Sequence, residues 1–213
     1  MTEKLSVTAT REDVYRLLAA CYYPPTAVLL EELSCAGLAE MLEHVAPDAA
    51  ESARQMASYC STTGLEEQLV EYSRLFLGPF KLVAPPYGSV WLDEAKVVMG
   101  ASTVRAAAFY DNCGLRLADD FTELPDHIAV ELEFMSYLAF KGREAAMAGD
   151  HLETERLSGL QRDFLADFLL PWLEPFTAAI IDDGESPLYQ AIARCTSNFV
   201  NADNAALTAN KHG

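Results

Sequence analysis

The chain has 213 residues, of which 51% are hydrophobic and 22% are charged, and 32 acidic residues against 15 Lys and Arg give a formal net charge of -17. This hydrophobic content excludes a disordered acidic protein and is sufficient for a sizeable buried core. The charge balance excludes binding to nucleic acid phosphates or to anionic membranes, because no cluster of Lys and Arg could neutralise them. We therefore expect charged partners to be cationic.

The cysteines favour a reduced, intracellular setting. There are five, and no two form a CxxC pair, which argues against a disulfide framework or a zinc knuckle. The N-terminal residues contain no apolar run of the kind found in signal peptides, and no window reaches the ~18 to 20 apolar residues expected of a membrane span. The sequence thus predicts a cytoplasmic protein whose thiols are mostly buried.

Apolar residues recur at helical spacing through the first third of the chain. Thr10 and Asp13 fit a capping box at the start of the first helix, and Pro24 and Pro25 end it. Pro47 suits the first turn of the fourth helix, and Gly64 is expected to end it in a left-handed conformation. The predicted helices of this part span about residues 10–23, 28–33, 38–45, 47–60 and 65–76.

Residues 78–93 (GPFKLVAPPYGSVWLD) break the helical period. Their prolines and glycines exclude a regular helix, yet half of the segment is apolar or aromatic. A solvated loop of this composition is unusual, because its apolar side chains need something to pack against. We therefore expect a loop that folds onto the core, or one that receives a partner.

Helical periodicity resumes near residue 101 and ends at Gly114, and an acidic connector follows. Pro125 fits the first turn of a long helix that ends near Gly149, and Pro171 and Pro187 mark a helix end and a helix start. The chain is predicted to be all-α, one domain over residues 1–213 with about nine to ten helices, one long Pro-rich and aromatic-rich loop, and a polar tail from about residue 201.

His127 is the histidine with acidic neighbours. On a helix it would share a face with Glu131, the geometry of half a metal site, and Asp126 would lie in the first turn. These three residues support one hypothesis, a metal-dependent all-α hydrolase. The structural interpretation is that Asp126 caps the helix and His127 pairs with Glu131. It is favoured because a metal needs three or four ligands and no other cluster supplies them.

Other catalytic patterns are missing from the sequence. It has no GxSxG elbow and no phosphate-binding glycine loop of either common type. Aromatic residues instead gather around the Pro-rich break, next to the acidic connector. This combination is typical of a groove that grips a short peptide with an apolar segment and a cationic end.

Three strings in this region resemble one known family. They are YSRLFLGP at 72–79, PPYGSVWLD at 85–93 and PDH at 125–127, ahead of a long helix. The sequence resembles the TorD/DmsD family of redox-enzyme maturation chaperones over nearly its whole length, and is most similar to the DmsD branch. Glu123-Leu124-Pro125-Asp126-His127 departs from the family pattern by shifting the proline one place.

The resemblance implies an all-helical cytoplasmic chaperone, not an enzyme, without a cofactor. Its client would be the catalytic subunit of a molybdopterin oxidoreductase of the DMSO/TMAO reductase type. The chaperone would bind the twin-arginine signal peptide of this subunit and delay its Tat export until the cofactor is inserted. Tat translocase components are a further implied partner. The implied oligomeric state is a monomer or a dimer. The implied peptide-binding positions are Tyr72, Leu75, Phe76, Phe80, Pro86, Tyr87, Trp91, Gly100, Asp126 and His127, where Tyr72, Phe80 and Tyr87 replace the family's usual tryptophans.

The residues suggest a mechanism for such binding. The two arginines of the signal peptide would pair with an acidic rim, and its apolar run would enter the aromatic groove. Protonation of His127 would make peptide binding sensitive to pH. The rim consists of Asp119, Asp120, Glu123 and Glu131.

Overall fold

A computed structural model describes residues 2–34, 37–78, 82–118 and 120–209 of the chain, and side chains from residue 10 onward except that of Ser34. Within these ranges the structure is helical and contains no strand, as predicted. The α-helices are α1 (Thr2–Ala20), α2 (Ala27–Ser34), α3 (Gly37–Leu42), α4 (Pro47–Cys60), α5 (Leu65–Tyr72), α6 (Gly88–Leu92), α7 (Ala101–Asn112), α8 (Ile128–Ala148), α9 (His151–Phe164), α10 (Leu170–Asp183) and α11 (Pro187–Ala209).

Two π-helical segments interrupt longer helices. Ser73–Leu77 continues α5, and Leu165–Leu169 joins α9 to α10. Counted as continuous stretches, the described residues form ten helices, which agrees with the predicted nine to ten. Pro171 lies in the first turn of α10 and does not end the helix, contrary to prediction, because the π segment before it absorbs the change in hydrogen bonding.

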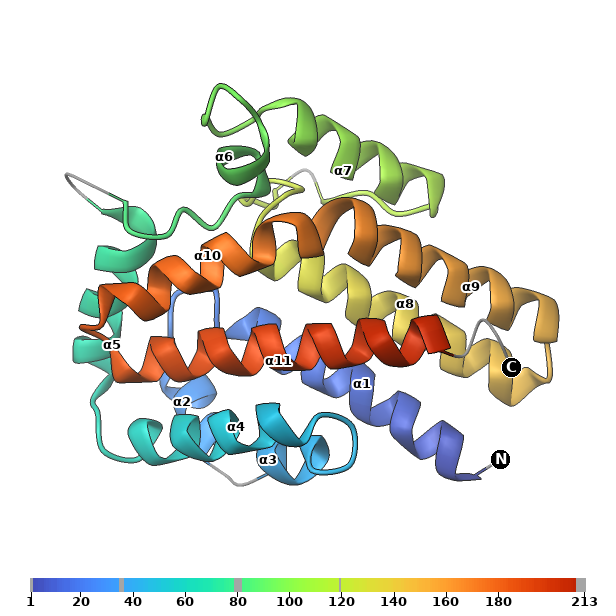
Figure 1. Ribbon diagram of the computed structural model, residues 1–213, viewed down its shortest axis with the longest axis horizontal. Helices are drawn as coiled ribbons and strands as arrows, with labels where there is room; N and C mark the ends of the chain where they lie inside the picture. The colour runs from blue at the N-terminus through green and yellow to red at the C-terminus, as the bar shows by residue number, and fades with distance from the viewer. Residues whose placement is uncertain (1, 35–36, 79–81, 119, 210–213) are drawn as a thin grey trace.

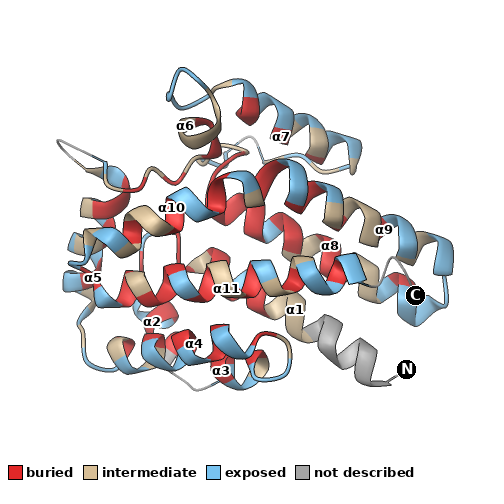
Figure 2. Cartoon of the chain, in the orientation of Figure 1, coloured by how far each residue is buried: buried red, intermediate tan, exposed pale blue. Residues whose placement is uncertain are grey.

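The helices form a layered bundle with a smaller cap (Figure 1). Helix α1 packs along α8, and α11 packs along α4 and α10. Helices α6 and α7, with the segments that flank them, lie across one side of the bundle over α8, α9 and α10. Figure 2 shows that the helix faces turned toward the bundle interior are buried, whereas α7 is largely exposed on its outer face.

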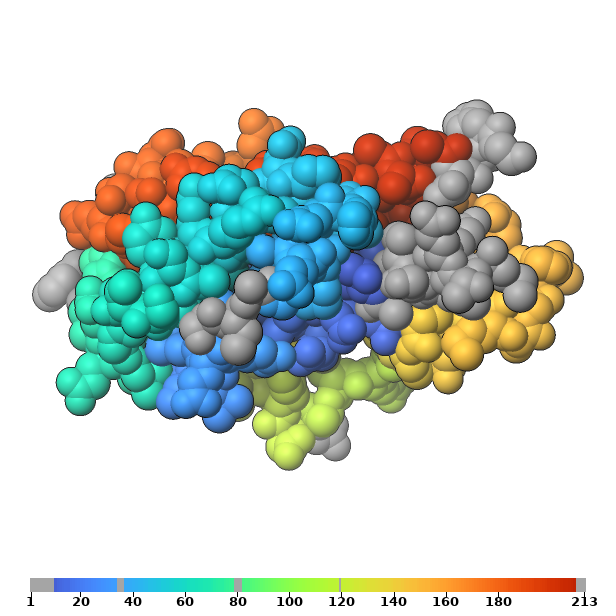
Figure 3. Space-filling view, turned by 90° about the horizontal axis from the view of Figure 1, so that it is seen from below, coloured from blue at the N-terminus to red at the C-terminus, as the bar shows by residue number. Residues whose placement is uncertain are grey.

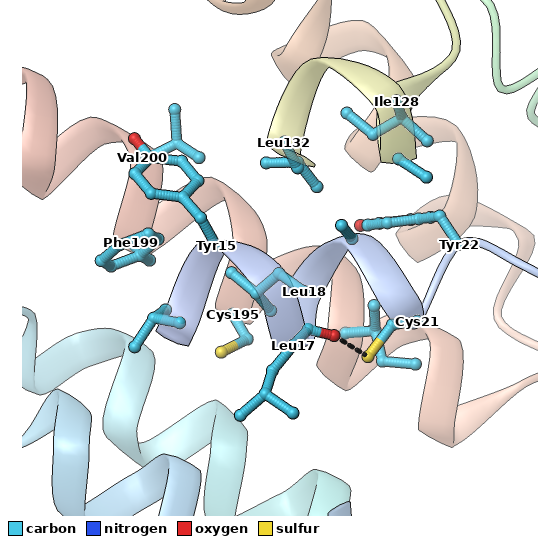
Figure 4. Close-up of a cluster of buried hydrophobic side chains, with 14 of the residues drawn as sticks. Tyr15, Leu17, Leu18, Cys21, Tyr22, Ile128, Leu132, Cys195, Phe199 and Val200 are labelled. Carbon is cyan, nitrogen blue, oxygen red and sulfur yellow. Dashed lines mark hydrogen bonds between the residues drawn. The ribbon is translucent and has the colours of Figure 1, made fainter. Parts of the chain in front are cut away.

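The core is centred on α1. Tyr15, Leu18 and Tyr22 are fully buried and lie between α8 and α11 (Figure 4). Tyr15 packs edge-on against Phe199 with ring centroids 4.8 Å apart, and the Tyr22 hydroxyl bonds Thr196 Oγ1 at 3.0 Å. The polar end of each ring therefore has a partner while its apolar body fills the core.

Both ends of the chain extend further as helix than predicted. Helix α1 begins at Thr2, so Thr10 lies in its interior instead of capping it. Helix α11 continues to Ala209, through the expected polar tail, because Asp203 is buried and pairs with Arg11 of α1. The Arg11 guanidinium also donates to Gln161 Oε1 at 2.6 Å, so this network ties α1, α9 and α11 together.

Four further predictions need correction. Residues 88–92, inside the segment 78–93 that was expected to contain no regular helix, form the short helix α6. Gly64 is the N-cap of α5 at φ -81°, and not a left-handed end of α4. Pro125 precedes the N-cap of α8, which is His127. The helical run His151–Asp183 is long and apolar enough to cross a membrane, contrary to expectation, although half of its apolar window is buried inside the bundle.

Candidate functional site

The Pro-rich segment is fastened to the start of α8. Gly88 N donates to Asp126 O at 2.8 Å, and Ile128 N donates to Pro86 O at 2.9 Å. Between them Tyr87 and His127 form an isolated antiparallel β-bridge. These bonds satisfy backbone groups that the prolines and the loop leave outside any helix. Two segments about forty residues apart in sequence thereby become one surface.

Asp126 lies at the centre of this junction and is 1% exposed. Its Oδ2 accepts from Ser89 N at 2.7 Å, so it holds the first turn of α6 instead of capping α8. Within the described part of the chain, Asp126 Oδ1 and Ser89 Oγ have no hydrogen-bond partner. A buried carboxylate oxygen without a donor is costly, and such groups often mark a functional site.

His127 is the N-cap of α8, since its Nδ1 accepts from Ala129 N at 3.1 Å. The imidazole lies between two tyrosines, with Tyr87 edge-on at 5.1 Å and Tyr23 stacked at 5.8 Å between ring centroids. Burial lowers the pKa of His127 to about 4. The imidazole is therefore neutral near pH 7, and the predicted pH sensitivity in the physiological range is not supported.

The carboxylate nearest to His127 is Glu123, and not Glu131 as predicted. Glu123 Oε2 lies 3.9 Å from His127 Nε2 and accepts a hydrogen bond from the Tyr87 hydroxyl at 2.9 Å. Since His127 is neutral near pH 7, the tyrosine supplies the bond that holds Glu123. Glu123 is half-buried and Asp120 is exposed, so both are accessible as rim residues.

Glu131 does not belong to the rim. It is 2% exposed and accepts from Trp172 Nε1 at 3.1 Å, deep against α10. Burial raises the pKa of Glu131 well above its usual value, because the charged form of the carboxyl is disfavoured away from water. The physical reason is that residues 128–132 are all buried, so the first turn of α8 lies inside the protein and carries Glu131 with it.

A metal centre at these residues is not supported. Glu131 is turned toward Trp172, Asp126 toward Ser89, and His127 toward the backbone of α8. No group of three or more His, Cys, Asp or Glu side chains is arranged to hold a metal ion in the described ranges. The hydrolase hypothesis therefore lacks the ligand geometry that it requires.

Four of the expected peptide-binding residues lie beneath the surface that the Pro-rich segment forms with the start of α8. Tyr72, Leu75, Phe76 and Pro86 are all buried. The Phe76 ring packs among Tyr72, Tyr22 and Tyr189 with centroids 5.2 to 6.1 Å apart. They do not line an open aromatic groove, because all four side chains are buried; Leu75 and Phe76 belong to the π segment at 73–77.

The remaining expected residues lie at or near the surface. Tyr87 and Trp91 are half-buried, and Trp91 Nε1 donates to Pro85 O at 2.8 Å. The loop after Trp91 carries Val97, Val98 and Met99, which are 44 to 71% exposed. Phe80 and Asp119, also expected in the site, lie outside the described residues.

Gly100 has a structural role at the start of α7. A Cβ atom added there would lie 1.9 Å from Asp93 Oδ2. That same oxygen accepts from Ser102 N at 3.2 Å and from Ser102 Oγ at 3.1 Å, so Asp93 caps the first turn of α7. Gly100 thus admits the capping carboxylate and fixes the loop that follows Trp91.

Two important residues, Tyr23 and Glu133, were missed by sequence reasoning. The Tyr23 hydroxyl bonds Glu133 Oε2 at 3.2 Å while its ring stacks on His127. This places a second tyrosine–carboxylate pair beside that of Tyr87 and Glu123. The sequence signal for Tyr23 was an aromatic residue at the end of a predicted helix, directly before Pro24 and Pro25. A side chain in this position is free to pack against a neighbouring element.

Comparisons with known proteins agree with one another. The family model described as nitrate reductase delta subunit matches residues 42–178. The Tat proofreading chaperone DmsD of Salmonella typhi is 32% identical over 84% of this chain and 81% of its own. The chaperone protein TorD of Shewanella pealeana is 28% identical, covering 70% of this chain and 64% of its own.

The fold is also found among solved structures. The crystal structure of a redox enzyme maturation protein from Archaeoglobus fulgidus matches with a TM-score of 0.58 and 24% identity, over 90% of this chain and 93% of that one. This likeness concerns the fold alone. The match of the family model to more than half of the chain, and the identity to DmsD over most of both sequences, show that the chain belongs to the TorD/DmsD family of redox-enzyme maturation chaperones, which are not enzymes.

Proposed function

We propose that this chaperone binds the twin-arginine signal peptide of the catalytic subunit of a molybdopterin oxidoreductase. Binding takes place in the cytoplasm and delays Tat export until the cofactor has been inserted. The names of the relatives, Tat proofreading chaperone and chaperone protein TorD, support this assignment. A twin-arginine signal carries two arginines ahead of an apolar run, and the two halves make different demands on a binding surface.

The observation that carries the proposal is a pair of tyrosine–carboxylate contacts around a buried acid. Tyr87 holds Glu123 at 2.9 Å and Tyr23 holds Glu133 at 3.2 Å, and both tyrosine rings contact the His127 ring. Next to His127 in the chain, Asp126 keeps an oxygen without a donor among the described residues. A guanidinium supplies five N–H donors in a planar fork, which suits carboxylates already fixed by hydroxyl groups.

Calorimetric titration of a signal peptide tests this proposal. The peptide comes from a molybdoenzyme of the same organism, and its matched control replaces both arginines with glutamines. We expect the first to bind and the control to bind at least tenfold more weakly, because a hydrogen bond to a charged group contributes about 1.5–3 kcal/mol. Raising the salt concentration should weaken the binding of the arginine peptide but not that of the control.

The chaperone side is tested with Glu123→Gln and, as a matched control, Glu40→Gln on α3. The first removes the charge but keeps an acceptor for Tyr87, so the fold is expected to survive. We expect it to weaken peptide binding about tenfold and Glu40→Gln to leave it unchanged. Absence of binding to every twin-arginine peptide from the organism's molybdoenzymes would refute the proposed function.

A further inference from the structure

An apolar groove lies beside the tyrosine–carboxylate pairs. It has a volume of about 230 Å³ and runs between α8 and the connector that follows α7. Residues 130, 133, 134 and 137 of α8 share one helix face and form one wall. Leu115 and Leu117 form the other wall. In Figure 3 the connector, yellow-green, runs along the lower edge of the molecule, and a narrow opening separates it from the blue α1–α2 region.

The floor of this groove is rigid. Phe134 and Tyr110 are about 5% exposed or less and pack against each other with centroids 4.6 Å apart. Phe134 also contacts Phe164 at 4.7 Å and Phe109 at 5.9 Å. Because these rings belong to the core, the groove needs no rearrangement before it accepts a ligand, and preorganisation of this kind reduces the entropic cost of binding.

The charge on the groove is negative. Glu133 lies in its wall, and no cation pairs with Glu133 within the described part of the chain. Although the residue as a whole is exposed, the protein around its carboxylate raises the pKa of Glu133. The one basic residue of the lining, Arg116, is already paired with Asp111 at 2.8 Å. A cationic group next to an apolar one is the complement of this surface.

The groove is continuous with the site around His127. The Tyr110 hydroxyl donates to Pro125 O at 2.8 Å, one residue before Asp126. On the other side, Tyr23 connects His127 to Glu133. A peptide whose arginine reaches Glu133 therefore places its next residues directly over the groove.

The volume limits what the groove can hold. A dry cavity of about 150 Å³ accepts a benzene molecule, whereas drug-sized ligands occupy pockets of about 300–1,000 Å³. A groove of about 230 Å³ thus suits one or two apolar side chains and not a whole cofactor or nucleotide. We infer that it receives the first apolar side chains that follow the arginines of the signal peptide, with one arginine paired to Glu133.

This inference rests on the proposed function and assigns a place to the apolar run. The buried ring cluster at residues 72–76 offers no open surface for it. The competing surface is the exposed strip formed by Val97, Val98 and Met99, which is carried on a loop between α6 and α7. The groove is preferred because it is concave, rigid and acidic at one edge.

The test uses the full chain and the signal peptide from the same organism. Leu117→Trp fills the groove, Glu133→Gln removes its charge while keeping an acceptor for Tyr23, and Val98→Ser alters the competing strip. We expect the first two variants to weaken binding at least tenfold and the third to leave it within twofold. Circular dichroism of each variant confirms that it is folded, and Leu117→Ala replaces Leu117→Trp if the larger side chain prevents folding.

A second measurement locates the peptide directly. A photoreactive leucine analogue at the first apolar position should cross-link to residues 115–117 or 130–137. Cross-links to residues 97–99, with unchanged affinity of the groove variants, would overturn the inference and leave the proposed function intact. Groove variants that alter sedimentation but not peptide affinity would also overturn it, by showing that a second copy occupies the groove. A wild-type protein that binds no such peptide would refute both.

Discussion

Replacing Gly100 by alanine tests how the loop after Trp91 is held. Gly100 has φ -81° and ψ -167°, a conformation that alanine also adopts, so the backbone itself is not strained by the change. The cost is steric, because the new Cβ would lie 1.9 Å from Asp93 Oδ2 and 3.2 Å from Ser89 Cβ. The Asp93 carboxylate must move, and α7 then loses the acceptor of its Ser102 N–H.

The expected destabilisation follows from that lost cap. Removing an N-terminal capping acceptor costs about 0.5–2 kcal/mol, and displacement of a half-buried carboxylate adds about 1 kcal/mol. We therefore expect Gly100→Ala to lower the free energy of unfolding by about 1.5–3 kcal/mol. Urea unfolding followed by circular dichroism measures this value.

Gly64 provides a matched control. It is also an N-cap with φ -81°, but no atom lies within 4 Å of a Cβ added to it. Gly64→Ala therefore measures the effect of replacing an N-cap glycine by alanine where no steric clash results. In a background of Asp93→Ala, which has already lost the cap, Gly100→Ala should cost less than in the otherwise wild-type protein, because only the 3.2 Å contact with Ser89 Cβ remains. Equal destabilisation by the two alanine variants in the otherwise wild-type protein would refute the role assigned to Gly100.

Three further predictions concern buried ionisable groups. The pKa of His127 in the folded protein is about 4, which is below its value in the unfolded chain. The wild-type protein should therefore lose stability relative to His127→Asn as the pH falls from about 6.5 to about 4. Urea unfolding at a series of pH values measures this loss. Glu131→Gln should change stability by less than about 1 kcal/mol at pH 7, because burial disfavours the charged carboxyl and the amide keeps an acceptor for Trp172 Nε1; a loss above about 3 kcal/mol in thermal unfolding would contradict this. Asp203→Ala should cost about 3–5 kcal/mol by leaving Arg11 buried without its partner, and Arg11→Met in the same chain should recover part of that loss; additive effects in the double variant would show that the pair is not coupled.

Much of the fold follows from local sequence signals. The period of apolar residues predicted an all-α chain, and glycines in left-handed positions marked the ends of α7 and α8 correctly at Gly114 and Gly149. The start of α11 at Pro187 was also predicted, since proline fits the first turn of a helix. The strings at 85–93 and 125–127 carry the resemblance to the family, and they are contiguous in the chain, so no knowledge of packing is needed to recognise them.

Other features depended on contacts between distant segments. A π segment lets the helix pass through Pro171, and the pairing of Arg11 with Asp203 keeps the last turns of α11 helical, although neither effect has a local signature. The degree of burial of the acidic residues also depended on tertiary contacts. Glu123 is half-buried and Glu131 is enclosed against Trp172, although both are acidic residues four positions from the same histidine in sequence.

The sequence by itself determined the helical class, most helix boundaries and the family. The tertiary structure decided which side chains of that family pattern are accessible, because exposure depends on how helices pack and not on residue type. It placed Tyr72, Leu75 and Phe76 in the core, and it brought Tyr23 into contact with Glu133 from elements more than a hundred residues apart in the chain. Neither the second tyrosine–carboxylate pair nor the groove next to it could be read from spacing, since each is formed by packing between separate segments.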